Sequence, residues 1–466
     1  MQLSEKQLNQ KIEEFIEANR APLVADIARL IAVRSVEEAP LPGAPFGEGP
    51  KKALETALQI GKDLGFEPHN CDNYVGWIEL AGQEEGHIAT VTHVDVVPEG
   101  EGWSGDAYTM RQRDGFIIGR GVADDKGPSV LCLYLAKFFK ELGVPLRYSL
   151  RILLGAAEET GMTDIPYYLE RNPQPLFCFS PDSEFPVCNG EKGHLNGVFA
   201  SPKLAGNIVA FSGGIATNAV PSRATCLVKG QAAALASTSN VSVTAEDGMV
   251  RLNAEGVGGH AAFPQGSVNA IALLVEYLLE NNLCTAEENQ YLQLLRRLHA
   301  GTDGSGVGIA CRDDAFDALT VIGGVISFEQ GQLRQVIDCR FPTATTGEKL
   351  EAILKEQAVQ AGASFEDVEA KEPFYIPADN PAIQTLLQAY NEVTGQNKQA
   401  FTMGGGTYAR CFNNAVSFGP EEPEAKLPSF AGPMHGADEA ASIDGLLDAL
   451  KIYILAVWRL QKVDLG

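Results

Sequence analysis

Residues 127–162 read GPSVLCLYLAKFFKELGVPLRYSLRILLGAAEETGM, and they contain the pattern that decides the fold. The stretch 127–143 predicts a helix, and the apolar stretch 147–157 predicts a buried strand that ends just before two glutamates. Similar strand-like runs cover 87–97 and 176–182, and helices are indicated over 6–33, 50–66 and 443–460. Alternating strands and helices are typical of an α/β fold, a mostly parallel sheet flanked by helices.

The middle of the chain has a different pattern. A hairpin with an Asp-Gly turn is indicated over 241–256, followed by a helix at 267–282, strands at 319–325 and 333–341, a helix at 347–362 and a strand at 363–373. The order β-α-β-β-α-β is the ferredoxin-like arrangement, so we expect an inserted α+β lid domain. The predicted boundaries are 1–191 for the first part of the catalytic domain, 192–377 for the inserted domain and 378–466 for the second part.

The composition narrows the classes of function. A formal net charge of −24 argues against nucleic acid as a partner, because no basic excess exists to neutralise phosphates. No run approaches the roughly 18 apolar residues of a membrane-spanning helix, and the opening MQLSEKQLNQKIEEF lacks the pattern of a signal peptide. The nine cysteines form no C-x-x-C pair, and no G-x-S-x-G motif of a serine hydrolase occurs. We therefore expect a cytoplasmic protein with reduced thiols and no membrane partner.

Acidic and histidine side chains gather where the predicted strands end. His93 and Asp95 are two positions apart, so they face the same side and the carboxylate can orient the imidazole. Glu158 and Glu159 form an adjacent pair at the exit of the opening strand. Asp124 and Asp125 stand at a predicted helix start, where one aspartate would suffice as a cap. Two more candidates are Asp182, after a third strand, and His435, in a loop of small residues.

These candidates all lie in the α/β domain, where open sheets build sites at the carboxyl ends of strands. Mixed imidazole and carboxylate ligands suit zinc, manganese or cobalt. Five ligands exceed what one tetrahedral ion needs, so a pair of ions bridged by one carboxylate is the simplest interpretation.

A resemblance to a known family rests on the motifs THVDVVP (92–98), GRGVADDKG (119–127), AAEETG (156–161), SPDSEFPV (180–187), GGHAAFP (258–264) and PMHGADE (433–439). The set resembles the metallopeptidases that include carboxypeptidase G, aminoacylase and carnosinase, and in particular the PepV-type dipeptidases among them. The resemblance spans nearly the whole chain, including the inserted domain.

The resemblance implies a role for each candidate. The Asp124 carboxylate would bridge two ions, and the peptide bond from Asp124 to the next residue would be cis. Glu158 would be the general base. Asp95 would orient His93. The remaining ligands would be His93 and Asp182 on the first ion, and Glu159 and His435 on the second. Aspartate at position 182 accompanies aminopeptidase or dipeptidase activity in that family, whereas glutamate accompanies carboxypeptidases and deacylases.

Further residues are implied outside the ion site. His260 of the inserted domain would stabilise the oxyanion, Asn218 would lie near the substrate, and Arg340 would clamp the free carboxylate. The stretch MGGGTYAR (403–410) implies Thr407 and Arg410 as additional substrate contacts.

The resemblance thus implies a dipeptidase with two divalent ions, zinc first and manganese or cobalt as alternatives, acting on dipeptides as a monomer or homodimer. An N-acyl amino acid deacylase or carboxypeptidase-like hydrolase of the same family stays open. So does a metal- or peptide-binding protein without activity, although its mark would be a missing ligand or base, and none is missing.

Overall fold

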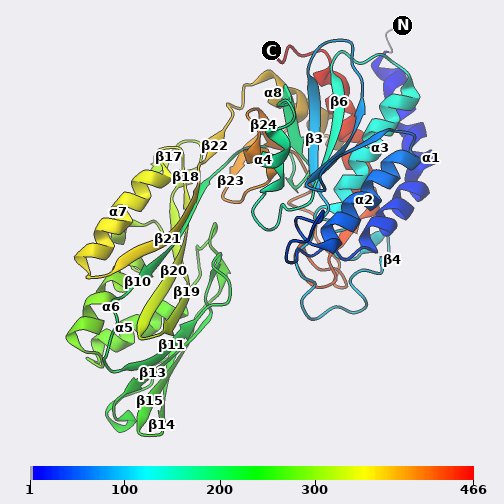
Figure 1. Ribbon diagram of the computed structural model, residues 1–466. Helices are drawn as coiled ribbons and strands as arrows, with labels where there is room; N and C mark the ends of the chain where they lie inside the picture. Colours follow the sequence, from blue (N-terminus) through cyan, green and yellow to red (C-terminus); the bar gives the residue numbers. More distant parts are fainter. Residues whose placement is uncertain (1–3) are drawn as a thin grey trace. The chain divides into compact units, whose positions relative to one another are not determined.

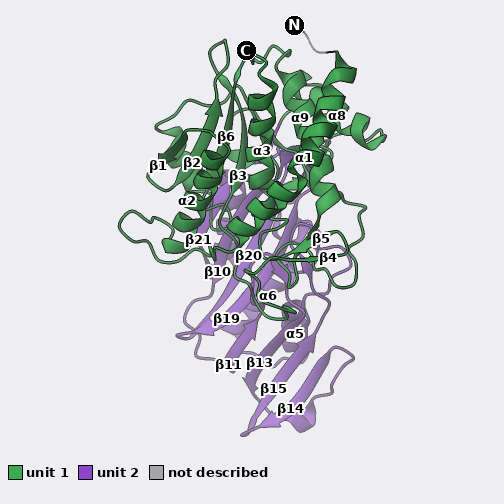
Figure 2. Cartoon of the chain, turned by 90° about the vertical axis from the view of Figure 1, so that its right-hand side faces the viewer, with its two compact units in different colours: residues 1–189, 376–401, 406–466 green, residues 190–375, 402–405 purple. Residues whose placement is uncertain are grey.

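The computed structural model describes residues 4–466 and contains two compact units (Figure 2). Unit 1 comprises the described residues up to 189 together with 376–401 and 406–466, and unit 2 comprises 190–375 and 402–405. The sequence placed the ends of the first part and of the insertion at residues 191 and 377. In the structure the corresponding segments end at 189 and 375. The short segment 402–405 was not expected in the insertion. It groups there because the Lys192 N–H donates to the Met403 carbonyl at 2.9 Å.

The central sheet of unit 1 (Figure 1) contains the strand predicted at 147–157, which is β6, and those predicted at 87–97 and 176–182, which are β3 and β7. Its order begins β1-β2-β6-β3-β7-β24. β6, β3, β7 and β24 are parallel neighbours, whereas β1 and β2 are antiparallel. β3 is buried along its whole length, as expected for a strand covered on both faces. The bounds are β1 Pro68–Cys71, β2 Val75–Leu80, β3 His87–His93, β6 Ser149–Gly155, β7 Phe177–Ser180 and β24 Ala415–Ser417.

Helices cover this sheet and confirm the α/β fold class. α2 and α3 pack directly on its strands, and α1 and α9 pack against α3. α1 is one continuous helix with Pro22 inside it, where the sequence allowed one helix or two. The bounds are α1 Glu5–Ile31, α2 Glu48–Asp63, α3 Lys126–Leu142, α4 Asp164–Leu169, α8 Pro381–Thr394, α9 Ile443–Leu460 and the 3-10 helix η3 Tyr408–Cys411.

Short strands complete unit 1 and its boundary with unit 2. β26 pairs with β5 and β5 with β4, while β25 pairs with β8. The bounds are β4 Arg111–Arg113, β5 Phe116–Ile118, β8 Ser183–Glu184, β9 Cys188–Glu191, β22 Phe374–Tyr375, β23 Phe401–Met403, β25 Pro420–Glu421 and β26 Ala440–Ser442. Among the described helices, none is both long and apolar enough to cross a membrane.

Unit 2 is built on an antiparallel sheet with its own hydrophobic core. The strand order is β14-β15-β13-β11-β19-β20-β10-β21, and α5, α6 and α7 accompany it. The bounds are β10 Gly193–Ala200, β11 Ile208–Gly213, β13 Arg223–Lys229, β14 Val241–Glu246, β15 Met249–Glu255, β19 Thr320–Glu329, β20 Gln332–Phe341, β21 Ser364–Lys371, α5 Ala270–Glu280, α6 Ala286–Leu298 and α7 Gly347–Gln360.

The ferredoxin-like unit is present, but its first strand is not the predicted one. The neighbours β21-β10-β20-β19 have the order of that arrangement when β10 is its first strand. The predicted first strand, the hairpin at 241–256, forms β14 and β15 and extends the sheet instead. The remaining elements are β12 Ala219–Val220, β16 Gly259–His260, β17 Arg312–Asp313, β18 Asp317–Ala318, η1 Ala232–Ala234 and η2 Ser305–Val307.

Candidate active site

The carboxyl ends of three parallel strands bring the predicted ligands of unit 1 together. β6, β3 and β7 are neighbours, so the residues that follow them meet at one edge of the sheet. His93 ends β3, Glu158 and Glu159 follow β6, and Asp182 follows β7. His435 arrives from the loop before α9 with a positive φ of 61°.

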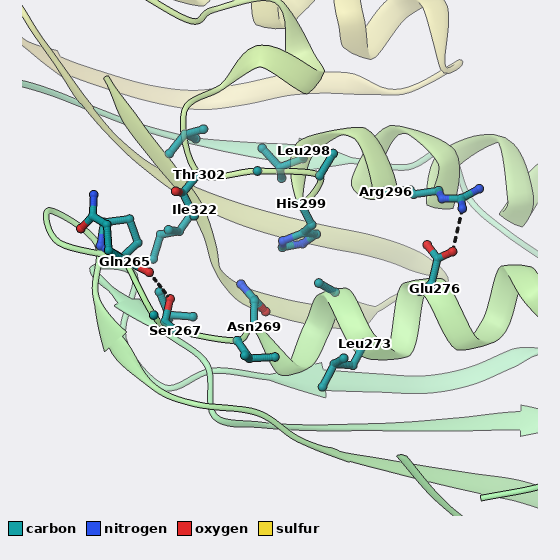
Figure 3. A pocket seen from close by; sticks show the side chains of 18 residues that line it. Gln265, Ser267, Asn269, Leu273, Glu276, Arg296, Leu298, His299, Thr302 and Ile322 are labelled. Atoms are coloured by element: carbon teal, nitrogen blue, oxygen red, sulfur yellow. Dashed lines mark hydrogen bonds and ion pairs between the residues drawn. The ribbon is translucent and has the colours of Figure 1, made fainter. Parts of the chain in front are cut away.

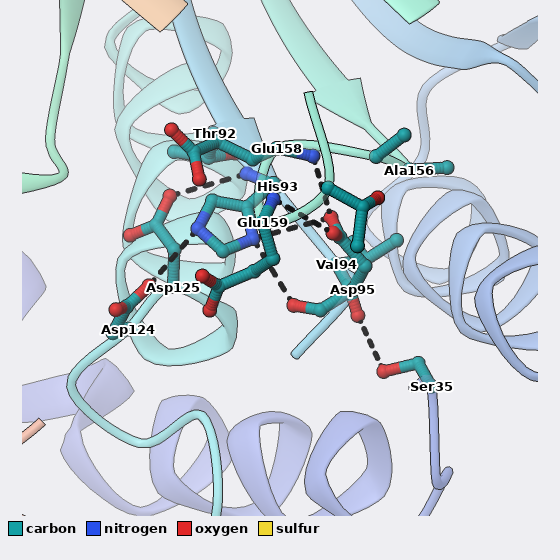
Figure 4. A network of polar contacts seen from close by, with 12 residues as sticks. Ser35, Thr92, His93, Val94, Asp95, Asp124, Asp125, Ala156, Glu158 and Glu159 are labelled. Atoms are coloured by element: carbon teal, nitrogen blue, oxygen red, sulfur yellow. Dashed lines mark hydrogen bonds and ion pairs between the residues drawn. The ribbon is translucent and has the colours of Figure 1, made fainter. Parts of the chain in front are cut away.

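His93 is wholly buried at the centre of this group (Figure 4). Its Nε2 lies 3.0 Å from Asp124 Oδ1 and 3.8 Å from Asp182 Oδ2. Its Nδ1 lies 3.0 Å from the backbone oxygen of Asp95 and 3.3 Å from Oδ1 of the same residue. A proton on Nδ1 would therefore leave the Nε2 lone pair directed at the carboxylates, which is the tautomer that a metal ligand needs.

Asp124 faces a second histidine with its other oxygen. His435 Nε2 lies 2.8 Å from Asp124 Oδ2 and 3.3 Å from Glu159 Oε1. The peptide bond between Asp124 and Asp125 is cis, as the resemblance implies. One carboxylate thus lies between two imidazoles, and each imidazole has a further carboxylate beside it.

The donor set fits divalent cations. Ligand atoms of His93, Asp124 and Glu159 lie within 4.8 Å of one another, and so do those of His93, Asp125 and Asp182. The Asp125 Oδ1 atom is buried without a hydrogen-bond partner among residues 4–466. A buried carboxylate oxygen without a partner is unfavourable unless a cation or a proton neutralises it. Imidazole and carboxylate together are ligands for zinc, manganese or cobalt.

The electrostatics of the group point the same way. Burial raises the pKa of Glu158, and the nearby Asp182 carboxylate raises it further. Burial and the Asp124 carboxylate likewise raise the pKa of Asp182. The hydrogen bonds to Asp124 and Glu159 raise the pKa of His435 to about 11. Without ions, the site therefore retains protons that cations would displace.

Asp95 supports this group through the backbone. Its Oδ1 accepts the Glu158 N–H at 3.2 Å, and its Oδ2 accepts the Glu159 N–H at 3.1 Å. The residue that lies beside His93 therefore also holds the turn that carries the two glutamates. Asp125, at the start of α3, does not cap that helix with its side chain and instead accepts the His93 N–H at 3.1 Å.

The predicted residues of unit 2 form a second group. His260 and Asn218 adjoin the small β12–β16 pair, where Ala219 is opposite His260. The Ala262 N–H donates to His260 Nδ1 at 3.1 Å, which leaves the proton of the neutral ring on Nε2. Burial and the Arg340 charge lower the pKa of His260. A neutral imidazole with a free Nε2–H can donate to an oxygen atom of a ligand.

Arg340 is held in a fixed orientation. Its Nε and Nη2 donate to the Asp338 carboxylate at 2.7 and 2.9 Å, and its Nη1 donates to the Gly404 carbonyl at 3.2 Å. The ion pair with Asp338 and the contact with the glycine-rich stretch 403–410 leave guanidinium hydrogens for a ligand carboxylate.

Comparison with known proteins decides the family. Residues 89–459 match the model of peptidase family M20/M25/M40. The chain belongs to this peptidase family. The expected family and the expectation of a peptidase are thereby confirmed.

Curated relatives of the M20 peptidase match nearly its full length. The β-Ala-Xaa dipeptidase of Lactobacillus delbrueckii subsp. lactis is 32% identical over 472 residues, which cover 97% of this chain and 98% of the relative. The YtjP protein of Bacillus subtilis is 31% identical over 463 residues, covering 94% and 97%.

Solved structures share the fold of this M20 peptidase at low identity. Human carnosine dipeptidase 1 has a TM-score of 0.59 and 13% identity, with 97% of this chain and 99% of that chain covered. The Bacillus subtilis YXEP protein, described as a dinuclear metal binding peptidase of the M20 family, has a TM-score of 0.53 and 12% identity, covering 96% and 100%.

Two predicted substrate contacts of the M20 peptidase lie at η3, Thr407 as its N-cap and Arg410 within it. Thr407 is buried, and its hydroxyl accepts the Ala409 N–H at 3.1 Å and lies 2.8 Å from Ser417 Oγ. It caps η3, so this position lends no support to a contact between its hydroxyl and a substrate. Arg410 follows in the same turn, partly exposed, with its N–H donating to the Thr407 carbonyl at 3.3 Å.

A separate cleft of about 600 Å³ lies within unit 2 of the M20 peptidase (Figure 3). Residues 264–269 and 298–302 line it together with parts of α5, α6 and β19, and these differ from the predicted site residues. Two of its polar side chains have partners within unit 2. Arg296 binds Glu276 at 2.7 Å, and Asn269 donates to the Gly323 carbonyl at 2.8 Å. Burial lowers the pKa of His299 to about 4 and keeps this ring neutral.

Sequence reasoning missed several residues that hold the site. Asp164 accepts the backbone N–H groups of Ala156 and Ala157 at 2.7 and 3.1 Å, and the Tyr408 hydroxyl donates to the same carboxylate. Arg120 and Glu439 form a buried ion pair at 2.5 Å. Both lie inside the family motifs GRGVADDKG and PMHGADE, and their opposite charges in these two motifs were the signal that the sequence offered.

Proposed function

We propose that this M20 peptidase hydrolyses dipeptides with two divalent ions, for which zinc is the first candidate. The observation that carries the proposal is the Asp124 carboxylate, whose two oxygens lie 3.0 and 2.8 Å from the imidazoles of His93 and His435. A carboxylate directed at two separate ligand groups is what a bridged pair of ions requires.

The proposed ligand sets follow from these contacts. His93, Asp124 and Asp182 would hold the first ion, and Asp124, Glu159 and His435 the second. When bound, such ions lower the pKa of a water molecule and polarise the scissile carbonyl. Asp125 stands near the first set as well, because its carboxylate lies with His93 and Asp182.

Glu158 is the proposed general base. It follows Ala157 at the end of β6 and stands next to the ligand Glu159 without sharing its contacts to His435. Its carboxylate would accept a proton from the attacking water and pass it to the leaving amine. Help of this kind contributes typically about 10²–10⁴-fold to the rate.

His260, Asn218 and Arg340 of unit 2 are proposed to act on the substrate. The His260 Nε2–H would donate to the oxyanion, since Nδ1 is occupied by the Ala262 N–H. The Arg340 guanidinium, oriented by Asp338, would bind the free carboxylate of the dipeptide. Asn218 would assist near the scissile bond. Two further observations support a dipeptide as substrate. Residue 182 is aspartate, which accompanies aminopeptidase or dipeptidase activity in the family, and the Lactobacillus relative is named a dipeptidase.

The test is a substrate panel assayed after chelation and after return of zinc, manganese or cobalt. We expect hydrolysis of dipeptides, no hydrolysis after chelation, and recovery with at least one ion. Preferred cleavage of N-acetylated amino acids or of longer peptides would favour a deacylase or a carboxypeptidase-like enzyme instead. No recovery with any ion would refute the metal-dependent reaction.

A further inference from the structure

A buried ion pair stands behind the ion site. Arg120 and Glu439 are 1% and 0% exposed, and Arg120 Nη1 donates to Glu439 Oε2 at 2.5 Å. The two residues are 319 positions apart, one in the segment before α3 and the other in the loop before β26. Neither is among the ligands proposed above.

Glu439 organises the backbone that presents Asp124. Its Oε1 accepts the N–H groups of Gly121 and Ala123 at 3.0 Å each and that of Asp124 at 3.3 Å. Three donors on one oxygen fix the path of residues 121–124. The direction of the Asp124 side chain depends on this path, because the side chain leaves from the last of the three.

Arg120 connects the same segment to two other loops. Its Nη2 donates to the carbonyls of Pro98 and Glu99, both at 3.3 Å, and to the carbonyl of His435 at 3.2 Å. The Pro98–Glu99 loop leaves β3 just after Asp95, and His435 is a proposed ligand. The guanidinium carbon also lies 5.3 Å from the centre of the Trp103 ring.

Stability alone is a weak reason to keep such a pair. Buried ion pairs can often be replaced by apolar side chains of similar volume at no loss of stability, because the two charges must give up their water. What apolar side chains cannot replace here are the contacts to backbone groups of Asp124 and His435, which need charged donors and acceptors at set positions.

We infer that Arg120 and Glu439 are positioning residues for the ion site, and that they set the distance and direction between Asp124 and His435. The inference rests on the proposed two-ion site. Residues that orient metal ligands typically change metal affinity or activity by about 10–100-fold when they are replaced.

The test compares Glu439→Gln and Arg120→Met with Arg151→Met as a matched control. Glu439→Gln keeps the volume but presents an amide NH2 either to Arg120 or to the three backbone N–H groups. Arg151 forms a similar partly buried pair with Glu79 at 2.5 Å in unit 1, and it also contacts the Tyr168 hydroxyl and the Trp77 ring. Zinc affinity is measured by competition with a chelator, and ligand geometry by the visible spectrum of the cobalt-loaded protein.

We expect zinc dissociation constants about 10–100-fold higher in Glu439→Gln and Arg120→Met, with an altered cobalt spectrum. Arg151→Met should keep wild-type zinc affinity and spectrum even if it unfolds at lower urea. Arg120→Lys, which keeps the charge but loses the fork, should not restore affinity.

Wild-type zinc affinity and an unchanged cobalt spectrum in folded Glu439→Gln would overturn the inference, and this variant decides the matter if Arg120→Met does not fold. An equal loss of affinity in Arg151→Met would also overturn it, because the effect would then be general destabilisation. A wild-type protein that binds no zinc or cobalt would instead refute the proposed function.

Discussion

Replacing Asp95 by asparagine tests how the turn with the two glutamates is held. In the wild-type chain both carboxylate oxygens accept a backbone N–H, from Glu158 at 3.2 Å and Glu159 at 3.1 Å. Asparagine keeps one oxygen and places an NH2 group against the other N–H. The His93 Nδ1 keeps the backbone oxygen of residue 95 as a partner at 3.0 Å, so the ring orientation should survive.

The magnitude follows from one lost acceptor. A buried N–H left without a partner costs about 1–3 kcal/mol. At about 1.4 kcal/mol per tenfold change, this corresponds to roughly 5–150-fold in zinc affinity or in kcat/KM if the whole penalty appears at the site. Asp95→Ala removes both acceptors and should lose more than Asp95→Asn.

The assay measures zinc affinity by chelator competition and kcat/KM on a dipeptide for wild type, Asp95→Asn and Asp95→Ala. The matched control is Asp313→Asn in unit 2, since that carboxylate also accepts backbone N–H groups, from Ala315 and Phe316 at 3.0 and 2.8 Å. The control should leave zinc affinity unchanged. Unchanged affinity and kcat/KM in Asp95→Asn would refute the reasoning that these two bonds hold the site.

Three further changes give separate tests. Glu158→Gln should retain both ions in metal analysis yet lose about 10²–10⁴-fold in kcat, and normal turnover would exclude Glu158 as the base. His435→Ala removes the contacts to Asp124 and Glu159, so the bound ions should fall from two per chain to one, and two retained ions would contradict the ligand assignment. Burial, with a smaller contribution from Arg151, lowers the pKa of His87 from 6.5 to about 4. Between these pH values the imidazole is therefore protonated in the unfolded chain and neutral in the folded chain. The free energy of unfolding should therefore decrease as the pH decreases through this range. His87→Phe should remove up to about 3 kcal/mol of that decrease in urea unfolding. Identical pH slopes in the two proteins would contradict this expectation.

Local patterns in the sequence were sufficient for β3, β6 and β7 of unit 1 and for the residues at the ends of these strands. His93, Glu158, Glu159 and Asp182 lie directly after apolar runs, and parallel strands bring such positions to one edge. The family resemblance added the family, which the match over residues 89–459 confirmed, and the roles of the single residues, which stay predictions.

Tertiary contacts explain what the sequence could not predict. Asp125 stands where a helix cap is expected, but a buried N–H of His93 is the donor that its carboxylate meets. The hairpin at 241–256 has every local sign of a strand pair, yet β10 rather than the hairpin begins the ferredoxin-like unit. Local patterns carry no information on which distant group becomes the partner. Arg120 and Glu439, each surrounded by glycine and small residues, are the clearest case.

The long separation between Arg120 and Glu439 also sets an order of events during translation. At about 5–20 residues per second, roughly 15–60 s pass between the synthesis of these two residues, which lie 319 positions apart. All of unit 2 except residues 402–405 is made before residue 376, within that interval. A ribosome-bound chain thus holds His93 and Asp124 well before it has His435 or Glu439. On the proposed ligand assignment, ion capture would therefore be one of the last steps in the making of the enzyme, because a chain that ends before His435 would lack one of the proposed ligands.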